Sequence, residues 1–124
     1  MKRVAAFGIL LLASCAVPQP DVERHGPPIE LAGRSPGPPD RCVPTVQLNS
    51  LRRSENDPHT LIYGGGRTIW ANNLGQCRFG ADDILVTEPH GSTYCRGDLV
   101  RSIDRTSHLP GPACVLNDFI PFRT

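Results

Sequence analysis

The stretch "TLIYGGGRTIWAN" (60–72) decides the fold class of this chain. Thr60–Tyr63 is a short run of β-branched, aliphatic and aromatic residues, and Arg67–Asn72 is a second run of the same kind. Three consecutive glycines, Gly64–Gly66, separate the two runs. Glycine adopts the positive φ that a tight turn needs, so short β-type runs joined by glycine are typical of hairpins. We therefore expect a β-hairpin over this stretch.

The rest of the chain after residue 40 shows the same alternation of short β-type runs and turn clusters. No segment places apolar residues at i, i+3, i+4 and i+7 behind a helix cap. Further strands are expected over Thr45–Leu51, over Asp83–Glu88 and Ser92–Ile103 as a second hairpin, and over Ala113–Phe122, broken at Pro121. The sequence thus predicts an all-β fold, a small antiparallel barrel or rolled sheet of about six strands, because both arrangements reduce exposed edges.

The N-terminus has the pattern of a secretory signal peptide. Lys2 and Arg3 are followed by an apolar run over 4–14, which is shorter than the about 20 residues that a membrane-spanning helix needs. The end of this run, "LASC" (12–15), resembles the lipobox of bacterial lipoproteins. That resemblance implies cleavage before Cys15 and a diacylglycerol on its sulfur, and two or three acyl chains anchor a protein stably to a membrane.

The residue after the cysteine bears on the compartment. Aspartate at this position often retains lipoproteins in the inner membrane, whereas this chain has Ala16. The resemblance therefore implies a cell-envelope protein, lipid-anchored in the outer membrane and facing the periplasm.

Composition divides the chain into three parts. Residues 1–14 are the expected signal peptide. Seven of the 13 prolines fall within 16–40, where apolar residues are few, so we expect 15–40 to be a lipidated cysteine followed by a disordered tether. The remaining part, 41–124, is the expected folded domain, which is small enough to need covalent staples.

Four cysteines fall in this domain and predict two disulfides: Cys42, Cys77, Cys95 and Cys114. Zinc is disfavoured because no two of them are spaced C-x-x-C and no histidine lies at ligand spacing, so we expect no metal and no cofactor. Under a meander topology, the pairs Cys42–Cys77 and Cys95–Cys114 would lie too far apart along the strands. Two patterns stay open: 42–95 with 77–114, and 42–114 with 77–95.

Nothing in the sequence predicts an enzyme or a nucleic-acid-binding protein. The only lysine, Lys2, lies in the expected signal peptide, and the rest of the chain is close to neutral. The four histidines lie in turn-like stretches without a recognisable catalytic partner: His25, His59, His90 and His108. A surface cleft that holds two or more of His59, His90, Asp83 and Asp98 would instead favour an enzyme. Asp82 and Asp83 are adjacent on a strand and so point to opposite faces. "RGD" (96–98) falls inside a predicted strand, where it is not displayed for adhesion.

Tyr63 and Trp70 are the candidate ligand-binding residues. They flank the triple glycine across the expected hairpin, where an aromatic pair is either part of the core or a surface for stacking a periplasmic ligand such as a glycan. The exposure of Trp70 separates these two interpretations.

The domain resembles a family of small bacterial lipoproteins and exported proteins built around a four-cysteine domain of unknown function. The matching elements are Cys42, "TLIYGGGRTIWANNLGQC" (60–77), "YCRGDLV" (94–100) and "CVLNDFIP" (114–121). The resemblance implies that Asn72 and Asp98 form turn or backbone hydrogen bonds, and it implies no catalytic residue. We therefore expect a non-enzymatic envelope protein with a structural or protein-binding role, attached to the membrane through Cys15.

Overall fold

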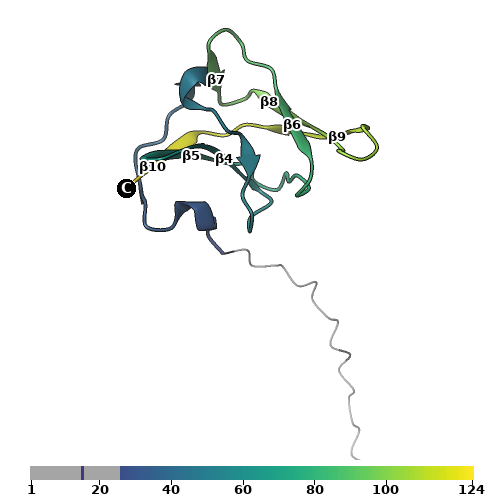
Figure 1. Ribbon diagram of the computed structural model, residues 1–124, viewed down its shortest axis with the longest axis horizontal. Helices are drawn as coiled ribbons and strands as arrows, with labels where there is room; N and C mark the ends of the chain where they lie inside the picture. The colour runs from purple at the N-terminus through teal and green to yellow at the C-terminus, as the bar shows by residue number, and fades with distance from the viewer. Residues whose placement is uncertain (1–14, 16–25) are drawn as a thin grey trace, which may run out of the picture.

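The structure is a computed structural model that describes Cys15 and residues 26–124 (Figure 1). The predicted signal peptide, 1–14, and the first part of the predicted tether, 16–25, lie outside the described residues. Within the described part, ten short β-strands and two 3-10 turns form the fold, and every strand pairing is antiparallel. The all-β class predicted from the sequence is confirmed.

A five-stranded sheet is built around the predicted hairpin. Its strands, in spatial order, are β1 (Ser35–Pro36), β10 (Phe119–Arg123), β5 (Thr68–Asn73), β4 (Thr60–Gly65) and β3 (Arg52–Arg53). Gly65 pairs with Thr68, so the hairpin loop consists of Gly66 and Arg67 alone. Gly66 has a φ of 72°, which a side chain would disfavour. The hairpin is confirmed, but its turn is Gly66–Arg67, whereas Gly64 and Gly65 lie in β4 and pair with β5.

Two smaller sheets complete the domain. One pairs β2 (Cys42–Pro44) with β7 (Thr93–Cys95), and the other has the order β6 (Ile84–Thr87), β8 (Leu99–Ile103) and β9 (Pro110–Val115). Figure 1 shows β6, β8 and β9 extending away from the five-stranded sheet, with the β8–β9 loop at their far end. The sheets of the described part keep open edges, so the rolled sheet is observed rather than the closed barrel.

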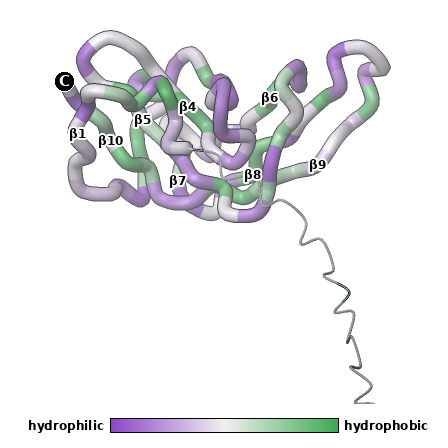
Figure 2. The backbone as a smooth tube through the Cα atoms, turned by 90° about the horizontal axis from the view of Figure 1, so that it is seen from below, coloured by the Kyte–Doolittle hydropathy of each residue, from purple (hydrophilic) through white to green (hydrophobic). Residues whose placement is uncertain are grey.

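The five-stranded sheet is covered on both faces at its centre. Leu61, Tyr63 and Trp70 join the main core, which also takes residues from β2, β8 and β9. Ile62 and Ala71 point to the other face, where Leu31 and Phe122 pack against them. Figure 2 shows the resulting hydrophobic stretches of β4, β5 and β10 side by side. Because both faces are buried, Thr60–Tyr63 is a continuous run of β-forming residues and does not alternate between apolar and polar residues.

Part of the segment assigned to the tether packs on the domain. The 3-10 turn η1 (Ile29–Leu31) carries Glu30, whose carboxylate accepts hydrogen bonds from Ser54 Oγ and the Glu55 N–H, both at 2.7 Å. A few residues later, β1 pairs with β10. The described chain is thus held against the domain from η1 onward, ahead of the predicted boundary at residue 41.

The strand expected over Thr45–Leu51 is wrong. The chain forms the 3-10 turn η2 (Thr45–Gln47) there, directly after β2 ends at Pro44. The Thr45 N–H bonds to the Ser92 carbonyl, and Ser50 then adopts a positive φ of 54°. These local turns replace the expected ladder.

The single last strand expected over Ala113–Phe122 is two strands, β9 and β10. The break lies between Val115 and Phe119 rather than at Pro121. Pro121 pairs with Trp70 inside β10, and its carbonyl accepts from the Gly37 N–H at 2.7 Å. In a strand, the N–H and C=O of one residue point to the same side, and the Pro121 carbonyl points toward β1. Proline has no N–H, so its position in β10 costs a hydrogen bond only on the β1 side and none with β5.

Candidate functional site

The aromatic pair predicted to bind a ligand is buried. Tyr63 is 1% exposed and Trp70 is 6% exposed. The Tyr63 ring stacks edge-on against Phe119, with 5.7 Å between ring centroids. The prediction of a ligand-binding face at Tyr63 and Trp70 is therefore wrong, because β8, β9 and β10 supply residues that cover this side of the hairpin.

The Tyr63 hydroxyl is enclosed together with its ring. It has no hydrogen-bond partner among the described residues, and burial raises the pKa of Tyr63 above its ordinary value. This group is a packing residue with an unsatisfied polar atom, which has consequences for stability rather than for ligand binding.

The disulfides join Cys42 to Cys95 and Cys77 to Cys114. Cys42 and Cys95 lie directly opposite each other in the β2–β7 pair, whereas Cys77 follows β5 and reaches the buried Cys114 on β9. Of the two patterns left open by the sequence, the first is observed. Cys15 is exposed and takes part in neither bond. Among the described residues there is no group of three or more histidine, cysteine or acidic side chains that could hold a metal ion.

His90 and Asp98, two of the four residues whose shared cleft would favour an enzyme, both line a cavity of about 290 Å³, which Glu88 and Arg101 also line. His90 Nε2 lies 3.8 Å from Asp98 Oδ1, while the other oxygen of Asp98 accepts from the Cys95 N–H at 2.8 Å. The His90 side chain is 83% exposed. The described residues that line this cavity include no serine, threonine or cysteine, so the pair has no neighbouring nucleophile there.

Several other polar residues singled out from the sequence have structural roles. Asn72 and Asp98 both bond to backbone groups, as the resemblance implied. Asp83 accepts from the Gly80 N–H at 2.7 Å and so caps a turn. "RGD" (96–98) lies in the turn between β7 and β8, not inside a strand, because Gly97 adopts a φ of 96°. Asp98 is largely buried within that turn, which removes the carboxylate from display.

The outer face of the β6–β8–β9 sheet is apolar and uncovered in the described chain. Along β8, Val100 and Ser102 point into the domain while Leu99 and Arg101 are exposed. Leu99 pairs with Val115, and Val86 pairs with Arg101. Val86, Leu99 and Val115 are 38%, 43% and 55% exposed. We call the following residues the outer face: Ile84, Val86, Leu99, Arg101, Ile103 and Val115.

Sequence reasoning did not find this surface. The signal was present in "DLVRSI" (98–103), where aliphatic residues occupy both alternating sets. An alternating strand with one solvent face carries polar residues on that face, so Leu99 and Ile103 beside Arg101 indicate a face suited to contact with another surface.

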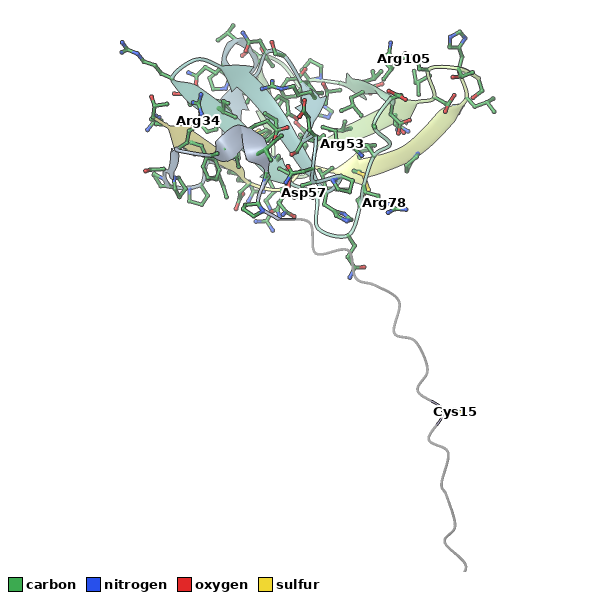
Figure 3. All side chains as sticks on the ribbon, turned by 60° about the horizontal axis from the view of Figure 1, so that its bottom comes forward. Cys15, Arg34, Arg53, Asp57, Arg78 and Arg105 are labelled. Carbon is green, nitrogen blue, oxygen red and sulfur yellow. A yellow bond between two sulfur atoms is a disulfide. The ribbon has the colours of Figure 1, made fainter. Side chains whose placement is uncertain are left out.

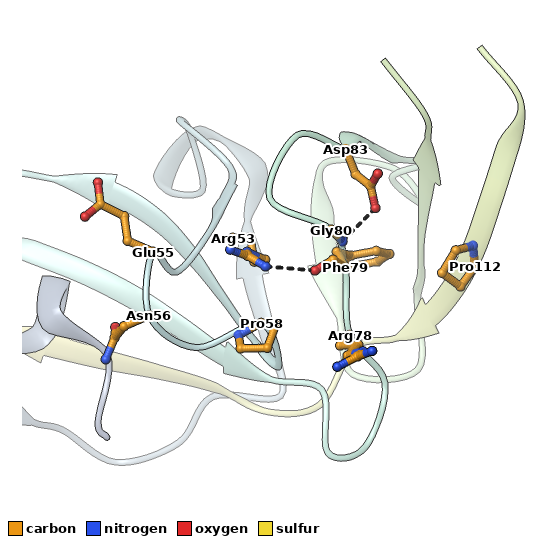
Figure 4. A pocket seen from close by; sticks show the side chains of 9 residues that line it. All are labelled: Arg53, Glu55, Asn56, Pro58, Arg78, Phe79, Gly80, Asp83 and Pro112. Atoms are coloured by element: carbon orange, nitrogen blue, oxygen red, sulfur yellow. Dashed lines mark hydrogen bonds between the residues drawn. The ribbon is translucent and has the colours of Figure 1, made fainter. Parts of the chain in front are cut away.

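A cavity of about 610 Å³ lies between the β3–β4 turn and the segment after Cys77. Two arginines, Arg53 and Arg78, and two acids, Glu55 and Asp83, line it (Figure 4). Arg53 donates to the Phe79 carbonyl at 3.1 Å. Because the Phe79 side chain is 2% exposed, this floor of the cavity is anchored in the core.

Comparison with known protein families, with curated proteins and with solved structures finds no match for this chain. A search of the described residues for a helix long and apolar enough to cross a membrane finds none.

Proposed function

We propose that this chain is an exported, lipid-anchored protein of the bacterial cell envelope whose domain binds another envelope protein and catalyses no reaction. The lipobox-like "LASC" (12–15) supports the anchor on Cys15, and Ala16 supports the outer membrane, periplasmic side. Two disulfides support an oxidising compartment, since such bonds persist mainly outside the cytoplasm. The resemblance to small four-cysteine lipoproteins agrees with this assignment.

The outer face carries the protein-binding part of the proposal. Leu99 and Val115 form a directly opposed pair, and Val86 lies diagonally from Leu99 on the neighbouring strand. Contiguous exposed aliphatic side chains on a small domain mark contact surfaces, because leaving them in water is unfavourable.

The edge strands of the β6–β8–β9 sheet make it more favourable for a partner to bind on the outer face than to add a strand at an edge. The edge strand β9 contains Pro110 and Pro112, and the opposite edge strand β6 has four residues. Proline on an edge and short edge strands both discourage pairing with a foreign strand.

Arg101 sets the chemistry of the partner. Its cationic side chain is exposed between Val86 and Ala113, among the aliphatic side chains of the outer face and beside the cavity that Glu88 and Asp98 also line. The partner that fits presents an aliphatic patch with a carboxylate placed to pair with Arg101.

Site-specific photocrosslinking in intact cells tests this assignment. A photoreactive amino acid at Val115 should give one discrete crosslinked protein, and the crosslink should disappear when Arg101→Glu is added. The same amino acid at Val46, a valine in η2 that is 83% exposed, is the matched control and should give none. Equal crosslinking from both positions, or crosslinking only to a second copy of this chain, would contradict the proposal.

A further inference from the structure

The cavity lined by Arg53 and Arg78 lies beside the point where the described domain begins. Asn56 lines this cavity and donates its Nδ2 to the Pro27 carbonyl at 2.9 Å and to the Gly26 carbonyl at 3.5 Å. Figure 3 shows Arg53 and Arg78 on the side of the domain that also carries Asp57, the neighbour of Asn56. The cavity and the start of the domain therefore share one side.

That side is close to the proposed anchor. Gly26 follows Cys15 by eleven residues. Even a fully extended chain covers at most about 3.6 Å per residue, so the start of the domain lies within about 40 Å of Cys15. With lipid on Cys15, the cavity is held within reach of the bilayer surface.

The charged groups of the cavity have both signs. Among the described residues Arg78 has no hydrogen bond or ion pair, and Arg53 uses only Nη1, on the Phe79 carbonyl. Asp83 has one oxygen on the Gly80 N–H, which leaves Oδ1 for a further donor. Figure 4 shows the Glu55 carboxylate turned away from both guanidinium groups.

We propose that this cavity binds a headgroup in which a phosphate stands next to a primary ammonium, as in an ethanolamine phospholipid of the bilayer that carries the anchor. The inference rests on the lipid anchor of the proposed function. Arg53 and Arg78 bind the phosphate, since guanidinium groups pair with phosphate oxygens in bidentate geometry. Asp83 accepts from the ammonium.

Charge explains the choice among phospholipids. Phosphatidylglycerol brings no cation to Asp83: its glycerol hydroxyls are neutral donors, which form weaker hydrogen bonds with a carboxylate than an ammonium does. A choline headgroup has no N–H to donate to Asp83. The ethanolamine headgroup satisfies both the arginines and the carboxylate, and a cavity of about 610 Å³ has ample room for it.

Protection of arginines from a dicarbonyl reagent tests the proposal on the full lipidated protein. The protein is inserted into vesicles of phosphatidylcholine alone, or of phosphatidylcholine mixed with either phosphatidylethanolamine or phosphatidylglycerol, and modification is quantified by mass spectrometry. We expect phosphatidylethanolamine to slow modification of Arg53 and Arg78 by about fivefold relative to phosphatidylcholine alone. Arg67, an exposed arginine in the β4–β5 loop, is the internal control and should react equally in all vesicles.

Two variants sharpen the result. Asp83→Asn keeps an oxygen for the Gly80 N–H and so preserves the turn, but it should reverse the preference so that phosphatidylglycerol protects better. Arg78→Gln should remove the protection of Arg53, whereas Arg67→Gln should not.

The possible outcomes distinguish failure of the headgroup site from failure of the lipid anchor on Cys15. Equal protection in all three vesicles, or stronger protection by phosphatidylglycerol in the unaltered protein, overturns the headgroup assignment. Full protection by free phosphoethanolamine at millimolar concentration in detergent assigns the site to a soluble ligand and overturns the membrane assignment. An intact mass without lipid contradicts the anchor instead, and the phosphoethanolamine arm then still tests the cavity.

Discussion

The side chain of Asn72 on β5 forms two hydrogen bonds with the backbone of Asn117, 45 residues further along the chain. Its Nδ2 donates to the Asn117 carbonyl and its Oδ1 accepts from the Asn117 N–H, both at 2.8 Å. Asn72 is fully buried. The Asn72 side chain thus supplies the hydrogen bonds that a neighbouring strand would give to the link between β9 and β10. It ties the five-stranded sheet to the segment that leads from the β6–β8–β9 sheet.

Replacing Asn72 should therefore destabilise the domain strongly. Asn72→Ala removes both hydrogen bonds and should lower the free energy of unfolding by about 2–3 kcal/mol. Asn72→Asp should cost more, since one carboxylate oxygen would face the Asn117 carbonyl. Asn73→Ala is the matched control: its exposed side chain holds only the Gly75 N–H and should cost about 0.5–1 kcal/mol. Urea unfolding measures all three, and equal losses for Asn72→Ala and Asn73→Ala would contradict the structural role.

The two disulfides should each contribute about 4 kcal/mol. They close sequence separations of 53 and 37 residues, which give similar loop-closure terms. We expect the double variants Cys42→Ala/Cys95→Ala and Cys77→Ala/Cys114→Ala each to lower the free energy of unfolding by about that amount. A non-reducing peptide map supplies the independent check: a peptide linking Cys42 to Cys77 would contradict the fold.

Much of the fold could be predicted from the sequence because local chemistry determines it. The hairpin over 60–73 follows from β-type runs around a glycine turn. Strand geometry under an assumed meander left two disulfide patterns, one of which is observed, although the strand order is not a meander. The break between β9 and β10 could not be found in this way. It depends on Asn72, a side chain that is remote in sequence from Asn117, while the visible local signal, Pro121, is harmless at its position facing β1.

The candidate site was harder to predict for a related reason. Tyr63 and Trp70 suggest a ligand face only if one side of the β4–β5 hairpin is open. Both sides are covered, one by Leu31 from a segment whose prolines indicated a disordered tether. The outer face, by contrast, depends on which strands lie beside β8, and that pairing is a tertiary property.

Tyr63 gives a prediction about alkaline pH. Burial raises the pKa of its hydroxyl, so the folded state favours the protonated form. The associated stability is present below the ordinary tyrosine pKa of about 10 and is lost as the pH rises above it. Tyr63→Phe removes this loss and also removes an unpartnered buried hydroxyl, so it should leave stability at neutral pH unchanged or raise it by about 1 kcal/mol.

Unfolding curves at neutral and alkaline pH measure the effect of Tyr63→Phe. Tyr94→Phe is the control at neutral pH, because the Tyr94 hydroxyl accepts a hydrogen bond from Thr87 at 3.3 Å and so has a partner to lose. It is no control at alkaline pH, because the charge of Tyr94 also raises the pKa of Tyr63. A strongly destabilised Tyr63→Phe protein at neutral pH would show that the hydroxyl is satisfied.

The outer face gives a prediction that separates binding from folding. Val115→Asp and Val46→Asp both place a carboxylate at an exposed valine, so each should change the free energy of unfolding by less than about 0.5 kcal/mol. Only Val115→Asp should weaken binding to the crosslinked partner, by about tenfold or more. Equal affinities of the two variants, measured by titration with the purified partner, would argue against the outer face.

The most direct measurement of the central claim is the intact mass of the native protein together with its reaction with a thiol reagent. A lipid-anchored exported protein with two disulfides should begin at Cys15, carry the added mass of acylated glycerol, and react with no thiol reagent before or after denaturation. A chain that still begins at Met1, or a Cys15 thiol that reacts with the reagent, would contradict the account.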